Sequence, residues 1–183
     1  MKFNRLAATA LASLSLLMPG AALADNSFDA HVSLADAIAE VGVDVYINPP
    51  EVCEDGIAGM YISGADALIV CQDNATGEEQ VDWTANDLDT LRHEAQHLIQ
   101  DCVAFRRGDQ TLAPMLGSDE DVIEFAYAIL GEERMQWIMD TYTKNGASAR
   151  TIILEFEAWA VGYGIDASDI EKALRHHCAV PAY

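Results

Sequence analysis

An apolar stripe at helical spacing, between residues 88 and 102, constrains the fold of this chain more than any other feature. Its members are Leu88, Leu91, Ala95, Leu98, Ile99 and Cys102. Because residues three and four positions apart share one face of an α-helix, the stripe predicts a helix with one side buried. Helical patterns continue almost to the end of the chain, whereas short strand patterns precede the stripe. We therefore expect an α+β fold, with a small N-terminal antiparallel sheet and a helix followed by a mostly helical portion.

The part of the chain before the stripe contains the expected strands. Alternating or apolar patterns predict strands at residues 43–47, 59–62 and 67–71. The four residues Ser63-Gly64-Ala65-Asp66 between the last two favour a hairpin turn. Ser33 is the expected N-cap of a preceding helix that reaches Val41.

The part of the chain after the stripe contains further helices. They are expected to begin after the capping residues Ser118, Ser148 and Ser168. Gly131 is expected to interrupt the first of them, and Gly146 to end the helical segment after that break. The expected helices span about residues 119–130, 132–145, 149–163 and 169–177.

The first 24 residues have the pattern of an export signal. Lys2 and Arg5 precede an apolar run at residues 6–17, and the Ala-Leu-Ala that ends at Ala24 matches a signal-peptidase site. The run is about 12 residues long, against the roughly 20 that span a bilayer, so an uncleaved membrane anchor is the less favoured alternative. Cleavage would leave residues 25–183 as a single domain, secreted or periplasmic.

The chain is strongly acidic, with 30 Asp and Glu against 10 Lys and Arg and a formal net charge of −20. Because the first 24 residues hold two of these bases and none of these acids, the net charge of the remainder is −22. Such a chain repels nucleic acid and anionic membranes, so we expect neither as a partner. A preference for cationic substrates would fit this charge, but the solubility of an exported protein is the simpler explanation.

Four cysteines lie after the export signal, and an even number in an exported chain favours two disulfides. Of the three possible pairings we favour Cys53–Cys71 and Cys102–Cys178. The first would tie a loop to a nearby strand, and the second would hold the end of the stripe helix to the C-terminus. A cysteine-rich metal site is the alternative, but no C-x-x-C spacing occurs.

The segment His93-Glu94-Ala95-Gln96-His97 lies within the stripe helix and has the pattern H-E-x-x-H. Two imidazoles one helical turn apart can bind one zinc ion. Glu94 would lie beside the metal, where its carboxylate can take a proton from a bound water. The pattern therefore indicates metal-assisted hydrolysis, most often of a peptide bond. Two solvent-facing histidines on a structural helix are the alternative.

A zinc hydrolase usually needs a third protein ligand. None of the remaining histidines follows His97 at the short spacing of a third histidine ligand, so a carboxylate is the better candidate. Glu155 and Glu157 stand in the otherwise apolar segment 152–160, where acids are unusual unless they are paired or bind metal. Positions i and i+2 of a helix point about 200° apart, so only one of the two acids can face the ion.

These two motifs resemble the gluzincins, zinc peptidases whose ligands are two histidines and one glutamate. The second helix of that family often reads E-x-x-small and then an acid or amide, and the small residue brings it close to the metal helix. Residues 155–158, Glu-Phe-Glu-Ala, are similar to the E-F-x-A form of the CAAX prenyl proteases. The resemblance thus implies Glu155 as the third ligand. Residues 157–160 are similar to the thermolysin-like form, which keeps Glu157 as the fallback.

The chain departs from the gluzincin pattern at the acid or amide that normally orients a zinc-binding histidine. That place is Trp159 after Glu155, or Val161 after Glu157. Another polar residue must therefore support the histidines, or the site is weaker.

The sequence predicts one Zn²⁺ held by His93, His97 and Glu155. Glu94 is the expected general base of an exported peptidase that acts on a peptide or protein substrate. One alternative is a catalytically silent zincin-like domain that binds a peptide or protein, although binding alone has no use for a base. Another is a disulfide-stapled structural protein without metal.

The donor to the oxyanion is left open by the sequence. Tyr163, His176 and His177 are candidates, because each carries an N–H or O–H group that could stabilise the developing charge. The two adjacent histidines also fit a solvated helix end, where a cationic imidazole suits the helix dipole, and we favour this interpretation for them.

Overall fold

The computed structural model describes residues 27–53, 57–104 and 111–179, and the predicted signal peptide lies outside them. Its elements are α1 (Phe28–Glu40), β1 (Asp44–Ile47), β2 (Gly59–Ile62), the 3₁₀ turn η1 (Ser63–Ala65), β3 (Ala67–Val70), α2 (Ala85–Val103), α3 (Asp119–Lys144), α4 (Ala149–Gly164) and α5 (Ala167–His177). Three short strands with a helix are thus followed by a mostly helical part, which confirms the predicted α+β class.

The sheet has the strand order β1-β3-β2 and is mixed. β2 and β3 form the predicted antiparallel hairpin, in which Gly59 pairs with Val70. β1 instead runs parallel to β3, with Asp44 opposite Ala67, so the prediction of an antiparallel sheet was wrong for this pair. All four residues of β3 are buried, and this most apolar strand takes the central position between the other two.

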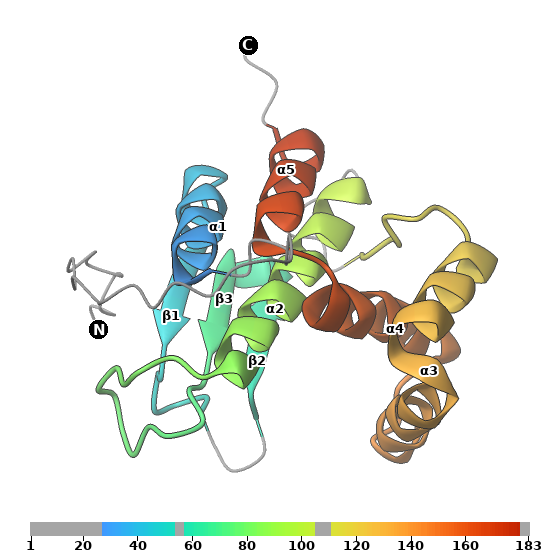
Figure 1. Ribbon diagram of the computed structural model, residues 1–183, viewed down its shortest axis with the longest axis horizontal. Coiled ribbons are helices and arrows are strands. Elements are labelled where there is room, and N and C mark those ends of the chain that lie inside the picture. The colour runs from blue at the N-terminus through green and yellow to red at the C-terminus, as the bar shows by residue number, and fades with distance from the viewer. Residues whose placement is uncertain (1–26, 54–56, 105–110, 180–183) are drawn as a thin grey trace, which may run out of the picture.

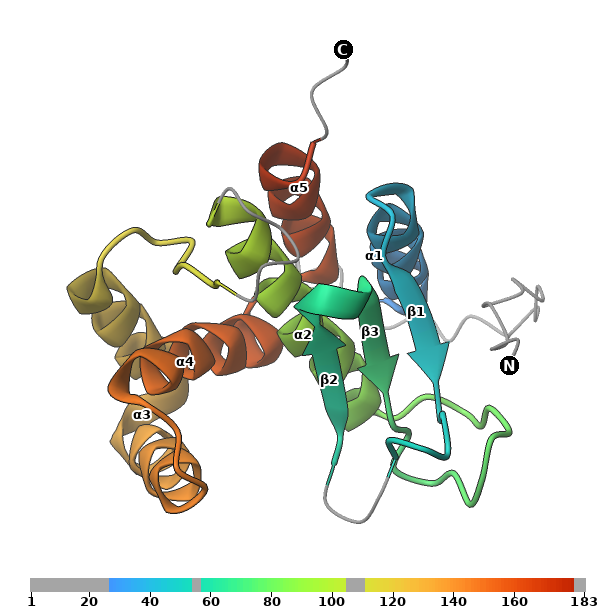
Figure 2. The same cartoon turned by 180° about the vertical axis from the view of Figure 1, so that it is seen from behind.

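Helices cover one face of the sheet. α1 packs against β1 and α5, and α2 packs against β2 and β3 (Figure 1). Seen from behind, the sheet has no described helix in front of it (Figure 2). The main apolar core lies between the sheet and these helices and includes Leu34, Leu68 and Leu98. α3 and α4 pack against each other beside it, around a second core that contains Ile138 and Phe156.

The first helix begins earlier than the sequence predicted. Its N-cap is Ser27, whose hydroxyl accepts from the Ala30 N–H at 3.2 Å. The predicted cap, Ser33, lies inside the helix, where its hydroxyl donates to Glu171 of α5 at 2.8 Å. A serine can occupy a helix interior when its hydroxyl has such a partner, so its presence alone did not mark the helix start.

The later helices follow the predicted breaks and caps closely. Gly131 is non-helical, with φ 73° and ψ 168°, and interrupts α3 as expected. Gly146 has φ 81° just beyond the end of α3, which is the backbone conformation that favours glycine at that place. Ser118 and Ser148 are the observed caps. Only α5 differs, because it begins at Ala167 rather than after the predicted cap at Ser168.

Both favoured disulfides are present, Cys53–Cys71 and Cys102–Cys178, and no cysteine is free. The second bond links the last turn of α2 to the residue that follows α5. It therefore holds the C-terminal helix against the helix that carries the H-E-x-x-H pattern. Within the described ranges, no helix combines the length and apolar character that crossing a bilayer requires.

Candidate metal centre

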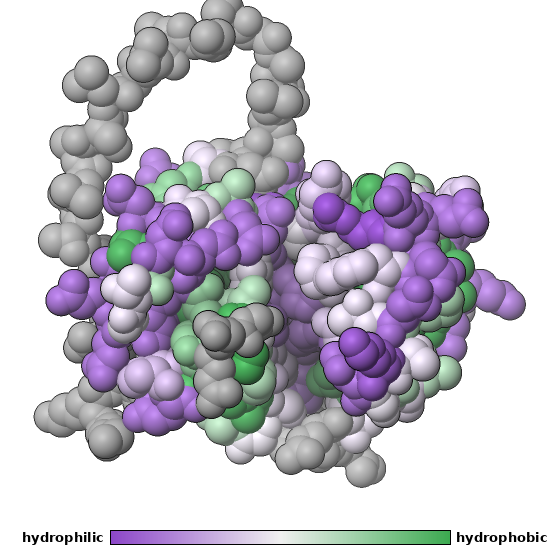
Figure 3. All heavy atoms as spheres, turned by 90° about the horizontal axis from the view of Figure 1, so that it is seen from below, coloured by the Kyte–Doolittle hydropathy of each residue, from purple (hydrophilic) through white to green (hydrophobic). Residues whose placement is uncertain are grey.

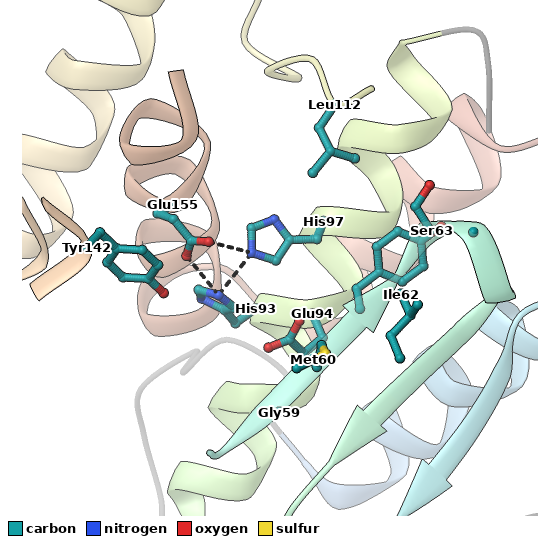
Figure 4. A pocket seen from close by; sticks show the side chains of 12 residues that line it. Gly59, Met60, Ile62, Ser63, His93, Glu94, His97, Leu112, Tyr142 and Glu155 are labelled. Atoms are coloured by element: carbon teal, nitrogen blue, oxygen red, sulfur yellow. Dashed lines mark hydrogen bonds and ion pairs between the residues drawn. The ribbon is translucent and has the colours of Figure 1, made fainter. Parts of the chain in front are cut away.

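Two histidines from α2 and one glutamate from α4 meet at a single point (Figure 4). The Nε2 atoms of His93 and His97 lie 3.2 Å apart. Glu155 places Oε2 3.4 Å from the first of these nitrogens and Oε1 3.5 Å from the second. The fold thus brings together the three residues that the sequence predicted as ligands, although they stand up to 62 positions apart.

The start of α2 is fixed by a capping box. The Thr84 hydroxyl accepts from the Asp87 N–H at 3.1 Å, and the Asp87 carboxylate accepts from the Thr84 N–H at 2.8 Å. These reciprocal bonds satisfy two N–H groups that a helix start leaves unpaired. The middle of the apolar stripe, Leu91, Ala95, Leu98 and Ile99, is buried in the main core, and this burial sets the direction in which both histidines project.

Small residues let α4 approach α2 closely. Glu155, Ala158 and Gly162 are three and four positions apart, so they share one face of α4. A Cβ atom at Gly162 would lie 2.9 Å from the Asp89 carbonyl oxygen and 3.1 Å from the Cβ of His93. Only a residue without a side chain fits at this crossing, and the short distance between the helices places Glu155 within reach of the histidines.

Glu157, the fallback ligand, points away from the histidines and is fully buried. Its Oε2 accepts from the side-chain amides of Gln96 at 3.0 Å and Gln100 at 2.8 Å. The backbone N–H groups of Met115 and Leu116 also donate to this carboxylate, at 3.0 and 2.9 Å. These four hydrogen bonds compensate the cost of burying the Glu157 carboxylate. Glu157 thus has a structural role, because its hydrogen bonds connect α4 to α2 and to the segment before α3.

Gln100 supplies the polar support that the sequence left unassigned. Its side-chain amide donates to Glu157 and to the Leu154 carbonyl at 3.0 Å, so its oxygen faces His97 Nδ1 at 2.8 Å. Nδ1 therefore carries the hydrogen in the neutral form of His97, and the lone pair of that form lies on Nε2, toward Glu155. Trp159, which stands at the usual orienting position, instead packs its ring edge-on to His93, with centroids 5.2 Å apart.

The donor atoms fit a tetrahedral zinc ion. Zinc–ligand bonds of about 2.0–2.2 Å place two tetrahedral ligand atoms about 3.4 Å apart. The two histidine Nε2 atoms are 3.2 Å apart, and each has one oxygen of the Glu155 carboxylate near it, Oε2 at 3.4 Å from His93 and Oε1 at 3.5 Å from His97. The Oε2 atom of Glu155 is buried, and among the described residues it accepts no hydrogen bond of ordinary geometry. A cation between these atoms would satisfy this oxygen and separate the two facing imidazole nitrogens.

Charge within the triad is tightly coupled. Burial opposes a charge on His97, but its contact with Glu155 outweighs this effect and raises the pKa of His97 to about 9. Burial alone would raise the pKa of Glu155, but the close contacts of its carboxylate with His93 and His97 hold it well below its ordinary value. Without metal, His97 is therefore protonated at neutral pH and paired with the Glu155 carboxylate.

Glu94 lies on the sheet side of the same centre and is only 6% exposed. One carboxylate oxygen of Glu94 and one ring nitrogen from each of His93 and His97 lie within 4.8 Å of one another. Burial raises the pKa of Glu94, and the two histidines and the backbone N–H of Tyr61 in β2 partly offset this effect. A carboxylate whose pKa is raised in this way is suited to accept a proton near neutral pH.

The centre opens into a cavity of about 490 Å³ between the sheet and the α3–α4 pair, and the space-filling view shows the hollow (Figure 3). β2 and η1 form one wall, and α2 forms the floor. The lining residues outside the centre itself are Gly59, Met60, Tyr61, Ile62, Ser63, Gly64, Leu112 and Tyr142. An edge strand therefore runs along one side of the cavity.

Tyr142 of α3 also lines the cavity, although the sequence did not mark it as a candidate. Its hydroxyl lies by Glu155 and accepts from the Trp159 indole N–H at 3.4 Å. Burial and the nearby carboxylate raise the pKa of Tyr142, so the phenol stays protonated and can donate a hydrogen bond. No periodic pattern in the sequence indicates that Tyr142 lies near Glu155, because this proximity depends on how α3 packs against α4.

The oxyanion donors that the sequence suggested lie elsewhere. Tyr163 is 54% exposed and stacks with Arg134, whose guanidinium carbon is 4.3 Å from the ring centre. His176 and His177 stand in the last turn of α5, exposed and packed on each other, as expected of a solvated helix end. None of the three lines the cavity.

Comparison of the chain with protein-family models, curated proteins and solved structures finds no match.

Proposed function

We propose that this chain is an exported zinc-dependent peptidase of the gluzincin type. The observation that supports it best is the convergence of the His93 and His97 Nε2 atoms with the Glu155 carboxylate, whose nearest atoms lie 3.2 to 3.5 Å apart, close to the ligand spacing of tetrahedral zinc. Glu94 stands next to these side chains with its pKa raised by burial. Two disulfides accord with the export that the first 24 residues predict.

Zinc bound by the triad would acidify a water molecule and polarise the carbonyl of the scissile bond. The carboxylate of Glu94 would serve as the general base that takes a proton from the attacking water, and it would return that proton to the leaving amine. Tyr142 would donate a hydrogen bond from its phenolic hydroxyl to the carbonyl oxygen as negative charge develops there, and would keep its proton. Gln100 holds His97 in the tautomer that directs its Nε2 lone pair into the triad.

The substrate in this proposal is an extended peptide that lies along β2. This strand is at the edge of the sheet and borders the cavity from Gly59 to Ile62. An edge strand can pair its backbone with an added strand. The peptide bond would then pass directly over the α2 histidines.

Metal analysis and a chelator experiment test the proposal. Protein dialysed against metal-free buffer and reloaded is expected to hold one zinc per chain and to cleave casein or a peptide library. A chelator should abolish cleavage, and added zinc should restore it. A zinc content near zero at pH 7 would exclude the function, and zinc binding without cleavage would favour a silent binding domain.

The affinity for zinc is expected to depend on pH. In the metal-free protein the pKa of His97 is raised to about 9, so this residue is protonated at pH 7 and must lose its proton to bind metal. The apparent affinity should therefore rise about tenfold per pH unit between pH 7 and 9 and level off above. Competition with a chromophoric chelator at several pH values measures this slope, and a flat response over the interval would contradict the coupling.

A further inference from the structure

Arg92 immediately precedes the first histidine of the metal centre and lies buried among three helices, at 4% exposure. Its Nε donates to the carbonyl oxygen of Gly162 in α4 at 2.9 Å. One terminal nitrogen pairs with the Asp89 carboxylate at 2.6 Å, and the other lies 2.6 Å from Nε2 of His31 in α1. Since His31 Nδ1 donates to the Ser27 carbonyl at 2.8 Å, its Nε2 carries the lone pair that accepts from Arg92.

The contact with Gly162 joins α2 to the end of α4. This carbonyl belongs to the last turn of α4, where carbonyl groups have no partner within the helix. A buried guanidinium satisfies it, and its positive charge suits the negative end of the helix dipole. At the same place the missing side chain of Gly162 lets the α4 backbone touch His93 and Asp89.

Glu155 lies between two such attachments. It stands seven residues, or about two turns, before Gly162 and on the same face of α4. On its other side, the Gln100 side chain donates to the carbonyl of Leu154 at 3.0 Å. α4 is therefore fastened to α2 both before and after the residue that faces the histidines. The attachment at Gln100 already contacts His97, whereas Arg92 contacts none of the three donor side chains.

We propose that Arg92, supported by His31, is a positioning residue that keeps Glu155 at ligand distance from His93 and His97. The inference rests on the proposed zinc site. It adds a contribution from α1, which carries His31 but no residue that lines the cavity. Arg92 acts through the backbone of α4 and touches neither metal nor substrate. Its loss would therefore weaken zinc binding by loosening the spacing between the two helices.

Zinc affinity and metal-free stability separate this role from a merely structural one. Arg92→Lys keeps the charge but replaces a planar fork by one ammonium, which cannot hold the same three acceptors. Gly162→Ala introduces a Cβ at the helix crossing. Gly164→Ala is the matched control, since its Cβ would meet Ile129 of α3, at 2.6 Å, and not α2. The dissociation constant for zinc is measured by chelator competition, and the thermal midpoint in EDTA by circular dichroism.

Arg92→Lys and Gly162→Ala are expected to weaken zinc binding about tenfold or more, as loss of outer support at metal sites does. Gly164→Ala should bind zinc within about twofold of the unaltered chain even where its midpoint in EDTA falls, because a disturbance of the α3 side leaves this attachment intact. Folded Arg92→Lys and Gly162→Ala proteins that bind zinc like the unaltered chain would overturn the proposal.

A second pair of variants tests the proposal if the first two do not fold. His31→Gln retains an acceptor for Arg92 and should keep the affinity, whereas His31→Leu has none and should weaken it about tenfold. Equal affinities for these two proteins would overturn the role of His31 and the coupling to α1. If the unaltered chain itself fails to bind zinc, the proposed function falls first, and the two failures are thereby distinguished.

Discussion

Glu94→Gln is expected to lower kcat/KM for peptide hydrolysis by about 10³-fold while leaving one zinc per chain bound. General bases typically contribute about 10²- to 10⁴-fold, and the amide has almost the shape of the carboxylate but cannot accept the proton. Its carbonyl oxygen can still take the hydrogen bond that the Tyr61 backbone N–H gives to Glu94. The measurement is kcat/KM on a fluorogenic peptide library, with the metal content determined on the same samples.

The control for this variant is its affinity for zinc, which should stay within a few-fold of the unaltered chain because Glu94 is not one of the three proposed ligands. Cleavage that continues at the original rate would remove Glu94 from the mechanism. A protein that holds zinc and cleaves nothing, with or without the substitution, would instead be the silent binding domain. A matching affinity for extended peptides in both forms would then point to capture as the function.

The parts of the site that the sequence predicted are those set by local patterns. The spacing of His93 and His97 and the apolar stripe around them depend only on the helical period, so they could be read from one segment. The breaks at Gly131 and Gly146 are equally local, because they depend on the backbone conformation of a single residue. Caps were less secure, since Ser27 and Ser33 offer the same hydroxyl and differ only in what lies nearby.

The parts that the sequence could not predict depend on contacts between distant segments. Glu155 and Glu157 stand in the same apolar helix, and the sequence does not show which of them faces the histidines. In the structure they differ because Glu157 is surrounded by hydrogen-bond donors. Two of those donors are backbone N–H groups at Met115 and Leu116, which carry no signal in the sequence. The parallel pairing of β1 with β3 and the presence of Tyr142 in the cavity likewise follow from tertiary packing.

Two isosteric substitutions, Glu155→Gln and Glu157→Gln, are expected to separate metal binding from folding. Glu155→Gln removes the anionic ligand of the triad and should weaken zinc binding by about 100-fold or more. Loss of a residue that only supports a metal ligand typically weakens binding by about 10- to 100-fold, and loss of a ligand should cost at least as much. Glu157→Gln places an amide NH₂ among four converging donors, so at least one donor loses its acceptor. Each lost hydrogen bond to a buried charged group costs about 1.5–3 kcal/mol, and we expect the metal-free protein to lose about 3 kcal/mol.

The stabilisation that zinc adds distinguishes these two outcomes. At free zinc about 1,000-fold above the dissociation constant, the unaltered chain should gain about 4 kcal/mol, whereas Glu155→Gln, binding about 100-fold more weakly, should gain only about 1.4 kcal/mol. Glu157→Gln should start from a lower stability in EDTA and still gain most of the increment from zinc, because its ligands are intact. Urea unfolding with and without zinc measures both terms. The reverse pattern, in which Glu157→Gln abolishes the zinc increment and Glu155→Gln retains it, would make Glu157 the ligand and require α4 to rotate from the orientation in which Glu155 faces the two histidines.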